Sequence, residues 1–145
     1  MDPVIRAHHL AAILTLLALA GCGAARSQES QAVDLGAEVT LAPGATAAVK
    51  AAGMKVRFVA VTEDSRCPRD TTCVWAGEVK VQIEIQQSSH SAPPVEMLEG
   101  GTTQAGGYRV TLVRVEPQPV STTRIAPQEY RATLRVDNDV GQPPR

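Results

Sequence analysis

The sequence predicts an all-β domain, an immunoglobulin-like β-sandwich of about seven antiparallel strands. Three observations predict it. Short runs alternate between apolar and polar residues, turn-forming residues separate these runs, and no long helical pattern follows the amino-terminal segment. Aromatic residues make up only 3% of the chain, so Val, Ile, Leu and Ala must supply the core. The formal net charge of −1 offers no basic surface for phosphates, which argues against nucleic-acid binding.

Residues 1–21 have the organisation of a secretory signal peptide. A short polar head containing Arg6 precedes an uninterrupted apolar run, LAAILTLLALA, at residues 10–20. A membrane-spanning helix needs about 20 apolar residues, whereas the apolar region of a signal peptide has about 7–15. We therefore expect residues 1–21 to direct export and to be cleaved.

The apolar run ends in Leu19-Ala20-Gly21-Cys22, which resembles the lipobox of bacterial lipoproteins. The resemblance implies that the Cys22 sulfur receives a diacylglycerol and that the new amino terminus is acylated. Several acyl chains hold a protein durably at a membrane, whereas one holds it only marginally. The residue after Cys22 is Gly23. In enteric bacteria an Asp at this position favours retention at the inner membrane, so by analogy Gly23 implies the outer membrane, facing the periplasm. The alternative is ordinary cleavage that leaves Cys22 as a free thiol.

Residues 22–36 are mostly small and polar without periodicity, which predicts a lipidated tether. We expect the sandwich domain to occupy residues 37–138 and a disordered tail to occupy 139–145.

Within the domain, the clearest predicted strand is 78–86 (EVKVQIEIQ), because every second residue is apolar. Residues 130–136 repeat this pattern. Residues 108–115 begin the same way, and their apolar positions then shift parity at Val113, which predicts a bulge or burial on both faces. Residues 54–62 become apolar on both faces, which predicts a central strand. Weaker strands are predicted at 38–41, 46–50 and 95–98.

Turn-forming residues separate these strands. We expect the two glycine pairs of the second half to bracket a turn. The turn signals are Pro43-Gly44, Gly53, Pro93-Pro94, Gly100-Gly101, Gly106-Gly107 and 117–119.

Cys67 and Cys73 are the two cysteines that remain once Cys22 carries lipid. In an exported protein an isolated pair predicts a disulfide. The closed loop is short, so its contribution to stability is about 2 kcal/mol. The spacing is not C-x-x-C, and no further cysteine is present to complete a zinc site.

Residues 63–77 (EDSRCPRDTTCVWAG) concentrate both cysteines and the single tryptophan in one connection between strands. Asp64-Ser65-Arg66-Cys67-Pro68 and Cys73-Val74-Trp75-Ala76-Gly77 resemble the paired motif of a family of small bacterial secreted proteins and lipoproteins without an assigned function. The resemblance also covers the Leu41-x-Pro43-Gly44 turn and the segments 108–119 and 125–136. The resemblance implies membership of this family but does not imply an activity.

One interpretation of this segment is a structural staple. Trp75 would then pack over the disulfide, and Arg66 would form an ion pair; its candidate partners are Asp64, Asp70 and Glu78. The lipoprotein would be purely structural or stress-related, with no ligand.

The other interpretation is a recognition surface. A closed loop is pre-organised, which lowers the entropy cost of binding, and Trp and Arg are common at binding hot spots. The candidate binding residues are Arg66, Arg69, Asp70 and Trp75. On these grounds we expect a non-enzymatic envelope module that binds an envelope protein or surface component. A further alternative is a protease-inhibitor-like loop presenting Arg69, although the loop is shorter than such inhibitors use.

Catalysis has little support in the sequence. His90 is the only histidine left after processing, and it lies in a polar loop, 86–94, where nothing is predicted to hold an imidazole. A copper site is the metal alternative, since Met and His are copper ligands. Its candidates, His90, Met54 and Met97, are scattered, and both methionines occupy core positions. We therefore expect no enzyme, no cofactor and no bound metal.

Overall fold

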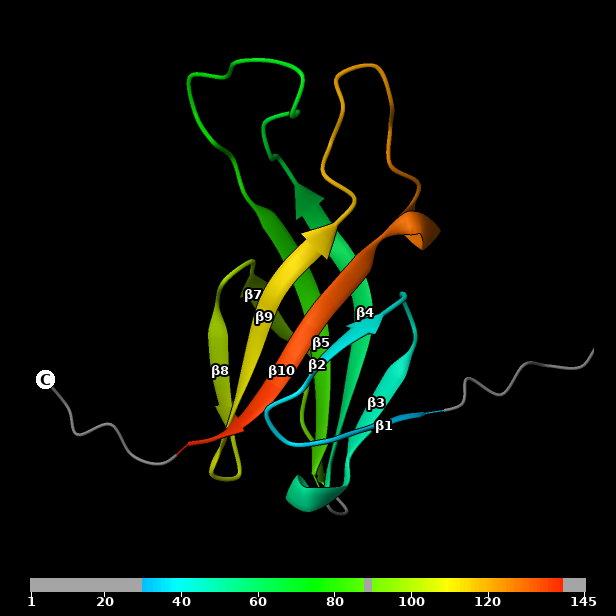
Figure 1. The fold of residues 1–145 in the computed structure, drawn as a ribbon, viewed down its shortest axis with the longest axis vertical. Coiled ribbons are helices and arrows are strands. Elements are labelled where there is room, and N and C mark those ends of the chain that lie inside the picture. Colours follow the sequence, from blue (N-terminus) through cyan, green and yellow to red (C-terminus); the bar gives the residue numbers. More distant parts are fainter. Residues whose placement is uncertain (1–29, 88–89, 140–145) are drawn as a thin grey trace, which may run out of the picture.

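The computed structural model describes residues 30–87 and 90–139, which form two β-sheets packed on one another (Figure 1). This confirms the predicted all-β sandwich. The first sheet has the order β1-β3-β4-β5-β6, with β7 also paired to β5, and the second has the order β2-β10-β9-β8. The strands of the first sheet are β1 (Gln31–Val33), β3 (Thr46–Val49), β4 (Met54–Asp64), β5 (Val79–Gln87), β6 (His90–Ser91) and β7 (Val95–Leu98). Those of the second are β2 (Glu38–Leu41), β8 (Thr102–Ala105), β9 (Tyr108–Glu116) and β10 (Arg131–Asn138).

The core lies between the sheets and follows from the alternation in the sequence. The apolar residues of β5 all point inward, and Phe58 of β4 is completely buried beside them. From the second sheet, Leu112 and Leu134 face them and are also fully buried. Met54 and Met97 belong to this core, as their strand positions predicted.

The described part of the chain contains ten strands rather than about seven. The unpredicted strands are β1, β6 and β8, which are short and lack an apolar alternation, so that only pairing with a neighbour orders them. The prediction of a single turn between the two glycine pairs is wrong, because β8 lies there and pairs with β9. The prediction that 86–94 has no strand is also wrong, since β6 pairs with the end of β5.

The domain begins earlier than predicted. β1 lies inside the expected tether and pairs in parallel with β3, and the Gly36 N–H donates to the Val136 carbonyl at 2.7 Å. At the other end, Asp139 forms an ion pair with Arg109 at 2.7 Å and thus belongs to the domain. The predicted signal peptide and Cys22 lie outside the described residues. No helix in the described ranges is both long and apolar enough to cross a bilayer.

Two irregular strands, β9 and β4, lead into the long loops at one end of the sandwich. The pairing of β9 with β10 skips Val113, which confirms the bulge predicted from the parity shift. β4 is central as predicted, but β3 pairs only with Met54–Arg57 at its start. The second half of β4 and the end of β9 therefore continue to the end of the sandwich from which two long loops project (Figure 1).

Candidate functional site

The candidate site is the stapled loop, by which we mean residues 65–78 between β4 and β5. The disulfide between Cys67 and Cys73 is present, with a Cα–Cα distance of 5.9 Å, as the sequence predicted. Below it, the two arms of the loop are joined by backbone hydrogen bonds. Ser65 N–H donates to Glu78 O at 2.8 Å, and Cys67 N–H donates to Ala76 O at 2.8 Å. The loop therefore rises on a paired neck rather than as an open coil.

Gly77 allows this neck to close. Its φ is +69°, a conformation that side-chain-bearing residues rarely adopt. A Cβ at this position would lie 1.8 Å from the Ser65 carbonyl oxygen on the opposite arm. Only glycine therefore fits here without displacing the backbone.

Arg66 fixes the base of the loop to the second sheet. Its guanidinium forms a bidentate ion pair with the Asp64 carboxylate, with Nε–Oδ1 at 2.9 Å and Nη2–Oδ2 at 2.7 Å. The same group donates to the carbonyl oxygens of Val115 at 2.7 Å and Pro117 at 3.0 Å. The Arg66 and Asp64 side chains are only 8% and 10% exposed. Asp64 is thus the partner of Arg66 among the three that the sequence left open, with Glu99 a second ion pair at 3.7 Å.

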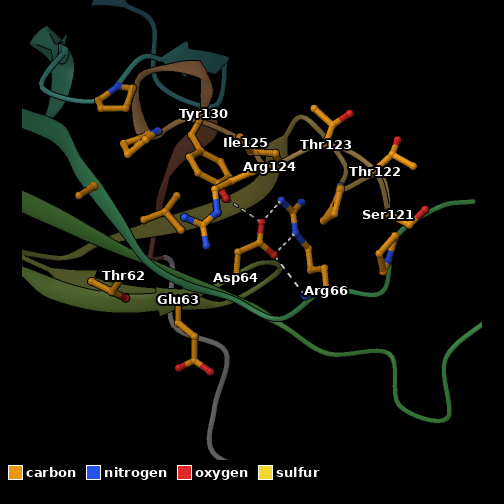
Figure 2. A pocket seen from close by; sticks show the side chains of 16 residues that line it. Thr62, Glu63, Asp64, Arg66, Ser121, Thr122, Thr123, Arg124, Ile125 and Tyr130 are labelled. Carbon is orange, nitrogen blue, oxygen red and sulfur yellow. Dashed lines mark hydrogen bonds and ion pairs between the residues drawn. The ribbon is translucent and has the colours of Figure 1, made fainter. Parts of the chain in front are cut away.

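Tyr130 completes this buried network, because its hydroxyl donates to Asp64 Oδ2 at 3.1 Å (Figure 2). Burial alone would raise the pKa of Asp64, but the hydrogen bonds and positive charge of Arg66, with the Tyr130 hydroxyl, outweigh it and lower that pKa. Burial tends to lower the pKa of Arg66, whereas the hydrogen bonds and negative charge of Asp64 raise it overall. Burial and the Asp64 carboxylate together raise the pKa of Tyr130. All three groups keep their ordinary charge states at neutral pH.

Asp70 attaches the far side of the loop to the segment 117–123. Its carboxylate accepts two hydrogen bonds from Ser121, from the backbone N–H at 2.9 Å and from the hydroxyl at 2.6 Å. These hydrogen bonds lower the pKa of Asp70. Alongside, the Arg69 N–H donates to Pro119 O at 3.0 Å. The loop is therefore held at its base and at its side.

Arg69 itself occupies the middle of a tight turn. Thr71 N–H donates to Pro68 O at 3.1 Å, and this hydrogen bond closes the turn around Arg69 and Asp70. The Arg69 side chain is exposed. An inhibitory loop would present this residue in an extended conformation, so the turn does not favour the protease-inhibitor alternative.

Trp75 corrects the staple interpretation. Its side chain is 83% exposed and does not pack over the disulfide. The neighbouring Val74 is 91% exposed. Both residues lie between the second cysteine and Gly77, on an arm of the loop whose backbone is fixed by the disulfide and the neck. The loop thus presents two adjacent large apolar side chains to solvent.

The structure divides the four candidate binding residues into two groups. Arg66 and Asp70 hold the loop in place, whereas Arg69 and Trp75 are free to contact a partner. Sequence reasoning missed Val74, although it adjoins Trp75 in the motif. It also missed Tyr130 and Ser121, whose roles depend on contacts across 66 and 51 residues of chain.

Beside the loop, a groove of about 710 Å³ runs between β4 and the segment 119–127 (Figure 2). The buried Asp64–Arg66–Tyr130 network lies at this groove. Within the described ranges, no three His, Cys, Asp or Glu residues are grouped so that they could hold a metal ion.

Comparisons with protein-family models, curated proteins and solved structures find no match to this chain. Membership of the family suggested by the D-S-R-C-P and C-V-W-A-G motifs stays a prediction.

Proposed function

We propose that the chain is a non-enzymatic lipoprotein of the bacterial cell envelope whose stapled loop binds a protein partner. Val74 and Trp75 are the contact residues in this proposal, and Arg69 provides a charged rim. The lipobox-like motif supports a lipid anchor at Cys22, at the outer membrane and facing the periplasm.

The exposure of Trp75 carries the proposal. Burying a large aromatic side chain is favourable, so a folded domain gains by packing its single tryptophan into the core. Here Trp75 is 83% exposed beside Val74, on a loop fixed by a disulfide, the Arg66 ion pair and the Asp70–Ser121 hydrogen bonds. A rigid support lowers the entropy that binding must remove, and tryptophan is the residue type most enriched at hot spots. Arg66 and Asp70 act as positioning residues.

The proposal is tested by photo-crosslinking in living cells. A photoreactive phenylalanine analogue placed at position 74 should give one discrete crosslinked product. The same analogue at position 51 is the matched control, because Ala51 is also an exposed apolar residue but lies in the short helix η1 (Lys50–Ala52), at the end of the sandwich opposite the loop (Figure 1). Adding Trp75→Ala should abolish the product at position 74.

The circular dichroism melting curve of the Trp75→Ala variant must match that of the unaltered chain. A variant that unfolds would support the staple interpretation instead. Equal crosslinking at positions 74 and 51 would contradict specific recognition by the loop.

A further inference from the structure

The second half of β4 has an open edge. β3 ends at the level of Arg57, and Phe58 closes that boundary, accepting from Gly44 N–H at 2.6 Å and donating to Ala45 O at 3.1 Å. From Val59 to Asp64, within the described part of the chain, the backbone of β4 pairs only with β5. The opposite edge of this stretch therefore has hydrogen-bonding capacity that no strand of the sandwich uses.

The groove described above lies along this edge. Five consecutive residues of β4, 60–64, line it. Side chains of consecutive strand residues point to opposite faces except at bulges, so a hollow that all five residues line includes the edge of the strand. Pro119, Ile125 and Pro127 contribute to the opposite wall.

This geometry fits a single extended strand. Free backbone groups along an edge recruit another extended backbone, which is how sheets bind peptides. The wall formed by 119–127 lies opposite this edge, so an occupant must fit between that wall and β4. The register of β4 with β5 also shifts at two places in this stretch, between Phe58 and Ala60 and between Val61 and Glu63. Such bulges interrupt a continuous ladder, so the edge suits a short segment rather than a whole sheet.

The charges at the groove indicate what that segment carries. Arg124 lines the groove, is exposed, and has no ion-pair partner among residues 30–87 and 90–139 (Figure 2). The other charged groups there are already paired: Glu63 with Lys80 at 2.9 Å, and Arg66 with Asp64. A carboxylate is therefore the group that the groove attracts through Arg124.

We propose that this groove binds an extended peptide segment of a partner protein, which adds a strand to the open edge of β4 and places a carboxylate at Arg124. The proposal uses neither Val74 nor Trp75, so it does not depend on recognition by the stapled loop.

The test uses the full chain in detergent solution and octapeptides selected on it from a random display library. Selected peptides should contain Asp or Glu, and changing that residue to Asn or Gln should weaken binding about tenfold in titration calorimetry. N-methylation of alternate peptide amides should abolish binding. Hydrogen exchange followed by mass spectrometry should show slower exchange in residues 59–64 on binding and no change in 65–78.

Charge-reversal variants give the decisive comparison. Arg124→Glu should weaken peptide binding about tenfold. Lys50→Glu is the matched control and should leave binding unchanged, because it lies in the short helix η1 (Lys50–Ala52) at the opposite end of the sandwich (Figure 1). Trp75→Ala should also leave it unchanged.

Three outcomes would overturn the proposal. Selection could yield no peptide that prefers the unaltered chain to Arg124→Glu. Selected peptides could slow exchange in 65–78 and not in 59–64. Finally, exchange in 59–64 could slow with rising protein concentration and no peptide present, in which case the occupant is a second copy of the chain.

Discussion

At the scale of single residues, Arg66 shows that a charged side chain in a candidate binding loop can have a structural role. Its guanidinium joins β4, the end of β9 and the following loop through Asp64, Val115 and Pro117. An exposed arginine would be a candidate contact residue, but this one is 8% exposed and its donors are occupied. Arg66 therefore supports the loop and does not belong to its exposed surface.

Replacing Arg66 with Ala should destabilise the domain by about 3 kcal/mol, because it leaves the Asp64 carboxylate buried without its cation. Chemical denaturation followed by circular dichroism measures this loss. Arg69→Ala removes an exposed arginine from the same loop and should change stability by less than about 0.5 kcal/mol. Equal effects of the two substitutions would contradict the anchoring role of Arg66.

Asp64 should make stability depend on pH in the acid range. Its pKa is lower in the folded chain than the ordinary value of about 3.9. The carboxylate therefore contributes stability above pH 4, and that contribution is lost as the pH falls through the folded pKa. Asp70 acts in the same direction, since its pKa is also lowered.

Unfolding measured between pH 2 and 7 should show this loss in the unaltered chain. In Asp64→Asn the curve should be flatter below pH 4, although the variant is less stable at neutral pH. A curve of unchanged slope would show that Asp64 does not contribute to the acid dependence.

At the scale of elements, the neck of the stapled loop depends on Gly77. Gly77→Ala places a Cβ against the Ser65 carbonyl and should cost about 2–4 kcal/mol, well above the ordinary cost of a positive φ. Gly53→Ala is the matched control, because Gly53 also has a positive φ, +57°, but nothing lies within 4 Å of its Cβ position. Its cost should be about 1–2 kcal/mol, measured by the same denaturation.

The elements that could be predicted from the sequence are those whose own residues alternate regularly between apolar and polar. The alternation in β5 and the parity shift in β9 are local, and both predictions are confirmed. β8 (TTQA) and β1 have no such pattern and exist because a neighbouring strand supplies partners. The open edge of β4 lies beyond local prediction for the same reason, since it depends on where β3 ends.

The candidate site likewise has some features that local sequence predicts and others that depend on the fold. The disulfide could be predicted because it needs only two cysteines and an oxidising compartment. The exposure of Trp75 could not, because an aromatic residue next to a strand is compatible with either packing or display. The contacts of Asp64 with Tyr130 and of Asp70 with Ser121 join distant segments and required the fold.

At the scale of the whole molecule, the proposed anchor and the proposed contact surface make one prediction about the mature protein. The intact mass of the chain purified from membranes should correspond to a chain that begins at Cys22 and carries acyl groups. Cys67 and Cys73 should resist alkylation until a reductant is added. Cys22→Ala should abolish the added acyl mass. An intact mass without acyl groups would contradict the lipoprotein assignment.

The single tryptophan, exposed on the stapled loop, also decides how this protein can be observed. Intrinsic fluorescence usually reports a tryptophan leaving the core, but Trp75 is already in water in the folded chain, so its emission should scarcely shift when the domain unfolds. Thermal unfolding followed only by tryptophan fluorescence would therefore miss the transition. The same emission should move to shorter wavelength when a partner covers the loop. The intrinsic tryptophan fluorescence of the chain would then report binding directly.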